Sequence, residues 1–107
     1  MAAPLPAIHL PSVAARHRLV EDLWALGFRR LSCTLEDAKN EMIGSDSTCI
    51  FLDWGGGEAP NICRLPFPTM LGLTRKSYNV GKFTWVNSPS HFIAYIKRSG
   101  IESEVDA

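Results

Sequence analysis

The stretch Thr48-Cys-Ile-Phe-Leu-Asp-Trp54 is rich in β-favouring apolar residues and is nearly apolar on both of its faces. A strand with two apolar faces is typical of the interior of a sheet that is covered on both sides. We therefore predict a central strand over 48–54. The triplet Gly55-Gly-Gly57 ends this strand, and the proline-containing segment from there to about Thr69 is predicted to be irregular or extended.

Three helices are predicted around this strand, each from a capping residue at its start and a glycine at its end. A capping side-chain oxygen binds free N–H groups of the first turn, and glycine readily adopts the left-handed conformation that ends many helices. The first of these helices is expected over 13–26. The capping residues and their terminal glycines are Ser12 with Gly27, Thr34 with Gly44, and Ser88 with Gly100.

The remaining segments complete a single α+β domain over 12–100. Residues 1–11 contain three prolines and are expected to form an extended N-terminal arm. A short strand is expected over 28–33, and 101–107 form an acidic C-terminal tail. The predicted fold has three helices packed on a small mixed or antiparallel sheet, in the order α-(β)-α-β-loop-β-β-α.

Composition bounds the class of protein. The chain has 107 residues, of which 46% are hydrophobic and 21% are charged, with a formal net charge of zero. These values are typical of one globular domain and exclude a disordered tail, a collagen-like repeat and a coiled coil. No apolar run of about 18 residues is present, so no membrane partner is expected. The chain start lacks the charged and apolar regions of a signal peptide, and three cysteines without paired spacing favour a reducing cytoplasmic location.

The charges are distributed unevenly along the chain. Residues 36–58 contain six acidic residues and one lysine, whereas residues 59–100 contain six basic residues and no acidic one. Within the second stretch, basic and aromatic side chains alternate over 72–87. Basic groups beside aromatic rings suit phosphate contact and base stacking. The predicted nucleic-acid-binding residues are Arg75, Lys76, Tyr78, Asn79, Lys82 and Trp85.

Two local structures are considered for this segment. In the first, 73–78 and 82–87 pair as a β-hairpin around Asn79-Val-Gly81. In the second, Thr74 caps a recognition helix that is followed by a wing over 82–87. The pattern Gly72-Leu-Thr-Arg-Lys-Ser-Tyr78 resembles that of small excisionase-type DNA-binding proteins, although two prolines within 64–70 depart from the scaffold helix of that family.

Two further classes of function stay open. A protein-directed inhibitor or adaptor, of the kind that phages and plasmids encode, would dock through Trp54, Gly55, Gly56, Gly57 and Phe67. A small thiol- or carboxylate-dependent enzyme would need Asp53, Glu58 or a cysteine to meet His91.

No catalytic, cofactor or metal motif is specific enough to support an enzyme, so no cofactor is expected. We therefore predict a small regulatory protein that binds another macromolecule. Nucleic acid is the first candidate partner, and a partner protein is the alternative.

Overall fold

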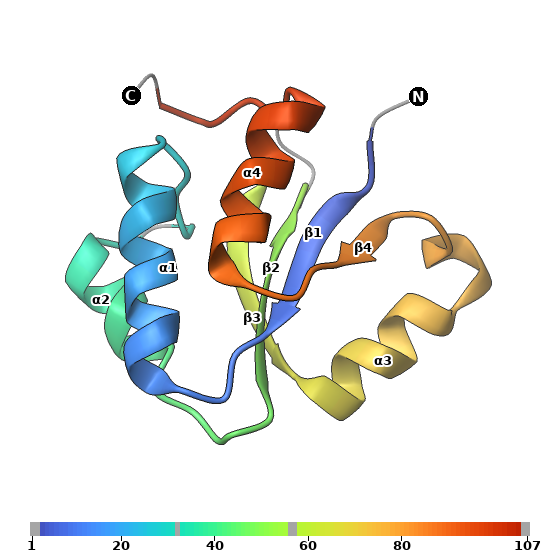
Figure 1. Cartoon of the computed structure of the whole chain (residues 1–107), viewed down its shortest axis with the longest axis horizontal. Helices are drawn as coiled ribbons and strands as arrows, with labels where there is room; N and C mark the ends of the chain where they lie inside the picture. The colour runs from blue at the N-terminus through green and yellow to red at the C-terminus, as the bar shows by residue number, and fades with distance from the viewer. Residues whose placement is uncertain (1–2, 32, 56–57, 106–107) are drawn as a thin grey trace.

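The computed structural model describes residues 3–31, 33–55 and 58–105, which form four α-helices, a short 3-10 turn and a four-stranded sheet (Figure 1). The elements are β1 (Leu5–His9), α1 (Val13–Ala25), α2 (Leu35–Glu41), β2 (Thr48–Asp53), β3 (Asn61–Pro66), α3 (Phe67–Arg75), η1 (Ser77–Asn79), β4 (Phe83–Trp85) and α4 (Pro89–Ser99).

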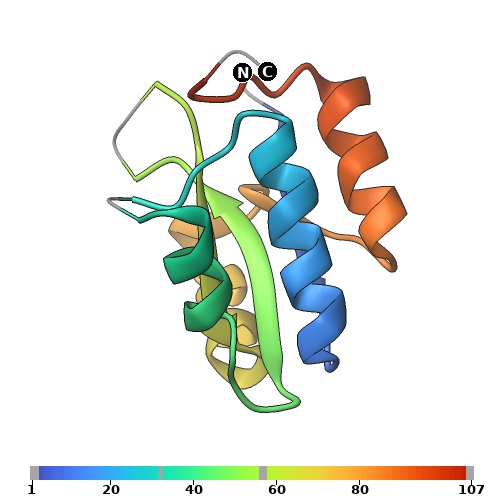
Figure 2. The ribbon, with the colours of Figure 1, turned by 90° about the vertical axis from the view of Figure 1, so that its left-hand side faces the viewer.

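The sheet is mixed and has the strand order β3-β2-β1-β4. β2 pairs antiparallel with β1 and with β3, whereas β4 runs parallel to β1. Helices α1, α2 and α4 lie on one face of the sheet, and α3 lies on the other (Figures 1 and 2). The predicted α+β class is therefore confirmed. The predicted order differs, because a fourth helix, α3, forms and because the sheet begins with β1.

Two cores result from this arrangement, one on each face of the sheet. The larger core lies under α1, α2 and α4, and α1 supplies Leu19, Val20 and Leu23 to it. The smaller core lies under α3, and its buried members are Ala7, Cys49, Phe51 and Met70. β2 supplies side chains to both cores, which is why its sequence is apolar on both faces.

The three predicted helices are confirmed at their starts, because each capping oxygen accepts the expected backbone bond. Ser12, Thr34 and Ser88 each accept an N–H bond at 3.2 Å from the residue three positions further on. α4 ends at Gly100, which has a φ of 66°. α1 is the longest helix, with 13 residues, and within the described ranges no helix is long and apolar enough to cross a bilayer.

The prediction of an extended N-terminal arm over 1–11 is wrong. Residues Leu5–His9 are extended, but they form an interior strand of the sheet rather than an arm. Pro6 is tolerated there because the ladder with β2 begins only at Ala7. Leu5 donates its N–H to the carbonyl of Lys82, the residue before β4. The nitrogen of Pro6 therefore faces the β2 side, where no ladder bond is needed.

Two other segments also differ from prediction. No strand forms at 28–33 within the described residues, and a single bridge joins Arg29 to Asn61. The segment predicted to be irregular or extended is an extended strand over Asn61–Pro66, where β3 pairs with β2 along six residues, but it is helical from Phe67. Pro66 caps α3 and Pro68 lies in its first turn, where a missing N–H costs no helical bond.

Both local structures predicted for 72–87 are wrong. Residues 73–75 belong to the last turn of α3, so no hairpin forms with the later strand. A recognition helix does not begin at Thr74 either, since its hydroxyl donates to the Leu71 carbonyl inside α3. The strand predicted over 82–87 exists over Phe83–Trp85, where it pairs with β1. The excisionase-type arrangement is therefore absent from this segment.

Candidate functional site

Three of the six basic residues after position 59 lie at the turn between α3 and β4. Arg75 ends α3, and Lys76 and Lys82 bound the turn that connects α3 to β4. All three side chains are exposed, and none makes an ion pair with a described residue. We call residues 75–82 the basic loop. The other three bases are exposed elsewhere, on β3 and in the last turn of α4, and they are Arg64, Lys97 and Arg98.

Asn79 has a structural position in the basic loop. Its side chain is buried, and its amide nitrogen donates to the Leu73 carbonyl at 2.9 Å. Its backbone N–H donates to the Lys76 carbonyl at 2.8 Å, and its own carbonyl accepts from Lys82 at 2.9 Å. The amide thus holds the loop against the end of α3, and it does not belong to the exposed surface that the basic residues form.

Aromatic side chains accompany the basic loop. Tyr78 is 66% exposed, and the Lys76 ammonium lies 5.9 Å from the centre of its ring. On β4, the ring of Trp85 is 37% exposed and meets Phe67 edge-on, with the ring centres 5.5 Å apart. Phe67 in turn stacks on His9 at 4.9 Å. We call His9, Phe67 and Trp85 the aromatic row.

The basic loop and the aromatic row belong to the same side of the sheet. Trp85 is paired with Ala7, whose side chain lies in the smaller core under α3. α3 begins at Phe67 in the row and ends at Arg75 in the loop, a helical length of about 12 Å. Lys82 directly precedes β4 and is about 10 Å of extended chain from Trp85. α3 and the 82–85 segment therefore connect the aromatic row to the basic loop.

The residues predicted for protein docking do not come together. Trp54 follows β2 at the end where Asp53 pairs with Asn61, and its ring packs against the larger core. Phe67 follows β3 at the opposite end of this ladder. About five residues of strand, or roughly 17 Å, separate the two positions. Gly55 is exposed beside Trp54, whereas Gly56 and Gly57 lie outside the described residues.

The residues of the enzyme hypothesis are used in local structure. Asp53 accepts the backbone N–H of Trp54 at 2.9 Å, as expected for a residue that stabilises a turn. His91 is exposed in the first turn of α4, and Glu58 is exposed beyond β2. Among the residues that the structure describes, no three His, Cys, Asp or Glu side chains are placed to hold a metal ion.

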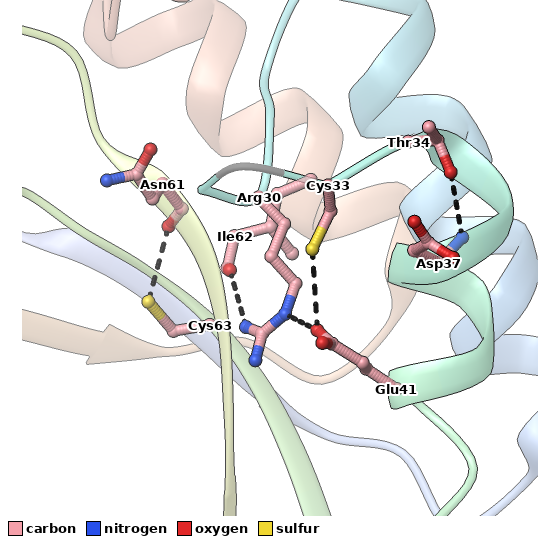
Figure 3. Close-up of polar contacts among 8 residues, drawn as sticks. All are labelled: Arg30, Cys33, Thr34, Asp37, Glu41, Asn61, Ile62 and Cys63. Atoms are coloured by element: carbon pink, nitrogen blue, oxygen red, sulfur yellow. Dashed lines mark hydrogen bonds and ion pairs between the residues drawn. The ribbon is translucent and has the colours of Figure 1, made fainter.

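The surroundings of each cysteine raise the pKa of its thiol. Figure 3 shows Cys33 beside Glu41, whose carboxylate also pairs with Arg30. Burial and the nearby negative charge of Glu41 raise the pKa of Cys33, and burial followed by the charge of Asp53 raises that of Cys63. Burial raises the pKa of Cys49 to about 11. A nucleophilic cysteine needs the opposite shift, towards the thiolate.

The ion pair at Glu41 gives a prediction on pH dependence. The hydrogen bond from Arg30, and then its charge, hold the pKa of Glu41 below its ordinary value. A lowered folded-state pKa stabilises the protein above the unfolded pKa, and this contribution is lost as the pH falls through the folded one. Glu41→Gln should therefore destabilise the protein at pH 7, and this penalty should shrink as the pH falls below the ordinary pKa of a glutamate, about 4.3, and through the lowered pKa of the folded state.

Urea unfolding at several pH values measures the effect of this substitution. Glu36→Gln is the matched control, because Glu36 lies on the same helix, is mostly exposed and has only a 4.0 Å contact with Lys39. A Glu41→Gln penalty that stayed constant from pH 7 to pH 3 would contradict the role given to Arg30.

The contact between His9 and Phe67 gives no signal in the sequence. The two residues are far apart in the chain and meet only because α3 packs on the sheet that contains β1. Phe67 lies between Pro66 and Pro68. A proline in the first turn of a helix is a signal for a helix start, so Pro68 is the local sign that α3 begins here.

Comparison with known proteins adds no assignment. No protein-family model matches this chain, and neither the curated proteins nor the solved structures contain a match. The functional argument therefore depends on the surface itself.

Proposed function

We propose that this chain is a non-enzymatic regulatory protein that binds nucleic acid through the basic loop and the aromatic row. The observation that carries the proposal is that Arg75, Lys76 and Lys82 are exposed without an ion-pair partner among the described residues, beside exposed aromatic rings. Positive groups left free in this way are available to phosphates. Had they been paired with the carboxylates of 36–58, this attraction would have been cancelled.

The net charge of zero favours binding through a small local contact, not through long-range electrostatic attraction. The net charge is zero, so the whole molecule exerts no long-range pull on a polyanion. Binding would depend on the local density of positive charge at the basic loop. The three free cysteines also suit a reducing, cytoplasmic compartment, where nucleic acids are accessible.

The test is the triple variant Arg75→Ala/Lys76→Ala/Lys82→Ala. We expect it to weaken binding to nucleic acid by about tenfold or more at low salt, because three phosphate contacts are lost. The slope of log Kd against log salt should also fall by about 2, at roughly 0.7 per phosphate of a single strand. Fluorescence anisotropy with a labelled oligonucleotide measures both quantities.

The chain offers a control that removes the same charge elsewhere. Arg64→Ala/Lys97→Ala/Arg98→Ala also removes three exposed bases and leaves the same net charge. This variant should bind within about twofold of the unchanged protein. Equal weakening by both triple variants would mean that only overall charge matters and would overturn the assignment of the surface. A chain that bound no nucleic acid at all would overturn the proposed function and favour docking on a protein.

A further inference from the structure

We infer that the ligand of this surface is single-stranded nucleic acid, held by stacking of unpaired bases on Trp85 and Tyr78. This inference rests on the proposed function and names the form of nucleic acid that the surface fits.

The exposed rings are placed to receive bases. Trp85 lies on a strand, and its edge-on contact with Phe67 supports the ring from one side while 37% of the residue faces solvent. Tyr78 is 66% exposed and has the Lys76 ammonium 5.9 Å from its ring centre. Every base has a flat face that can stack on such rings, but in a duplex these faces are covered by neighbouring base pairs. The rings therefore suit a strand whose bases are unpaired.

The groups that read a duplex groove are not presented by the described part of this surface. Groove recognition uses a helix or a two-stranded ribbon that projects from the protein and carries polar side chains towards base edges. α3 packs on the sheet through Met70 and Leu73, and Arg75 at its last position is its one basic residue. β4 is a three-residue strand within the sheet, and the amide of Asn79 is buried against Leu73.

The size of the surface fits a short strand. The three basic residues lie at the ends of one loop, and about 10 Å of extended chain separates Lys82 from Trp85. We expect a site of about four nucleotides, the lower end of the range for single-strand-binding domains. Three phosphate contacts at about 0.7 each predict a salt slope of about −2, which is shallow for a nucleic-acid-binding protein.

The experiment compares labelled 12-nucleotide oligothymidylate and oligouridylate with a DNA duplex of mixed sequence and equal length. We expect both single strands to bind at least tenfold more tightly than the duplex, measured by anisotropy with the full chain at two salt concentrations. The DNA and RNA strands are expected to bind alike, because stacking does not read the sugar.

Substitutions then test the rings themselves. Trp85→Ala should weaken single-strand binding by about 5- to 100-fold, which is the range measured for the loss of one stacked base, and Trp85→Phe should retain most of it. Tyr78→Ala should have an effect in the lower part of this range. Val80→Ala is the matched control, because Val80 is 71% exposed in the same loop and has no ring. A urea unfolding curve for each variant shows that it is folded, and Tyr78→Ala tests stacking even if Trp85→Ala does not fold.

The outcomes separate the two proposals. A duplex bound as tightly as the single strands, with both lost in the Arg75/Lys76/Lys82 variant, would overturn the single-strand inference and leave the proposed function in place. Single-strand binding that neither Trp85→Ala nor Tyr78→Ala changed would overturn the stacking mechanism. Absence of binding to every oligonucleotide would overturn the proposed function and the inference together.

Discussion

Replacing Arg16 with leucine should lower the free energy of unfolding by about 3–5 kcal/mol. Arg16 is fully buried on α1, and its guanidinium donates to the carbonyls of Leu10 and Met42, the latter at 2.8 Å. A third, longer bond of 3.4 Å reaches the Gly44 carbonyl. One side chain therefore donates hydrogen bonds to carbonyls in two segments, the connection between β1 and α1 and the chain that leaves α2. Leucine fills part of the same space but leaves these acceptors without a donor.

Urea unfolding followed by circular dichroism measures this loss. Arg18→Leu is the matched control, because Arg18 lies two residues further along α1 and is exposed, and it should change stability by no more than about 0.5 kcal/mol. Arg16→Lys keeps the charge but cannot reach three carbonyls in the fork geometry of a guanidinium, so its cost should be intermediate. Similar losses for Arg16→Leu and Arg18→Leu would contradict this account.

Arg16 also shows where the limits of sequence-based prediction lie. Nothing in the spacing of α1 distinguishes it from Arg18, because its partners come from segments on either side that are brought together only by folding. The features that the sequence predicted well are local. Ser12 and Ser88 cap their helices within three residues, and the apolar run of β2 requires two covered faces wherever its neighbours come from.

The features that the sequence predicted badly depend on distant pairing. Prolines favoured an irregular or extended structure up to about Thr69, yet a helix begins at Phe67, because Pro66 and Pro68 lie at the junction of β3 and α3, where they break no required hydrogen bond. β1 and β4 pair in parallel through residues about eighty positions apart. A parallel pair is not joined by a tight turn, so the sequence contains no hairpin signal for this pairing.

The candidate surface was therefore predictable in composition but not in shape. The excess of basic residues after position 59 identified Arg75, Lys76 and Lys82, which are exposed and make no ion pair with a described residue. The stacking of His9 on Phe67 was not predictable, since the two residues meet only in the folded chain. Asn79 illustrates the reverse error, because a polar residue in a turn resembles a binding residue until its hydrogen-bond partner is known.

Replacing Gly27 with alanine should destabilise the protein by about 2–4 kcal/mol, for two separable reasons. Gly27 follows α1 with a φ of 97°, a backbone conformation that residues with a side chain rarely adopt. The acidic tail also returns to this point, since Val105 donates its N–H to the Gly27 carbonyl at 3.1 Å. A Cβ at position 27 would lie 1.8 Å from the Val105 carbonyl oxygen, so the tail would have to move.

Gly81→Ala separates the two costs. Gly81 has a φ of 84°, and a Cβ there would have no heavy atom within 4 Å, so this variant should show the backbone strain alone, at about 1 kcal/mol. The additional cost at Gly27 is then the displacement of the tail. If the chain is ended after Glu102, the contacting atoms of Ser103 and Val105 are removed, and the additional cost of Gly27→Ala should disappear in a double-mutant cycle of unfolding free energies. If the additional cost of Gly27→Ala persisted in the shortened chain, its origin would lie elsewhere at the end of α1. If Gly27→Ala and Gly81→Ala lowered the free energy of unfolding equally in the full chain, the tail would not hold this position in solution.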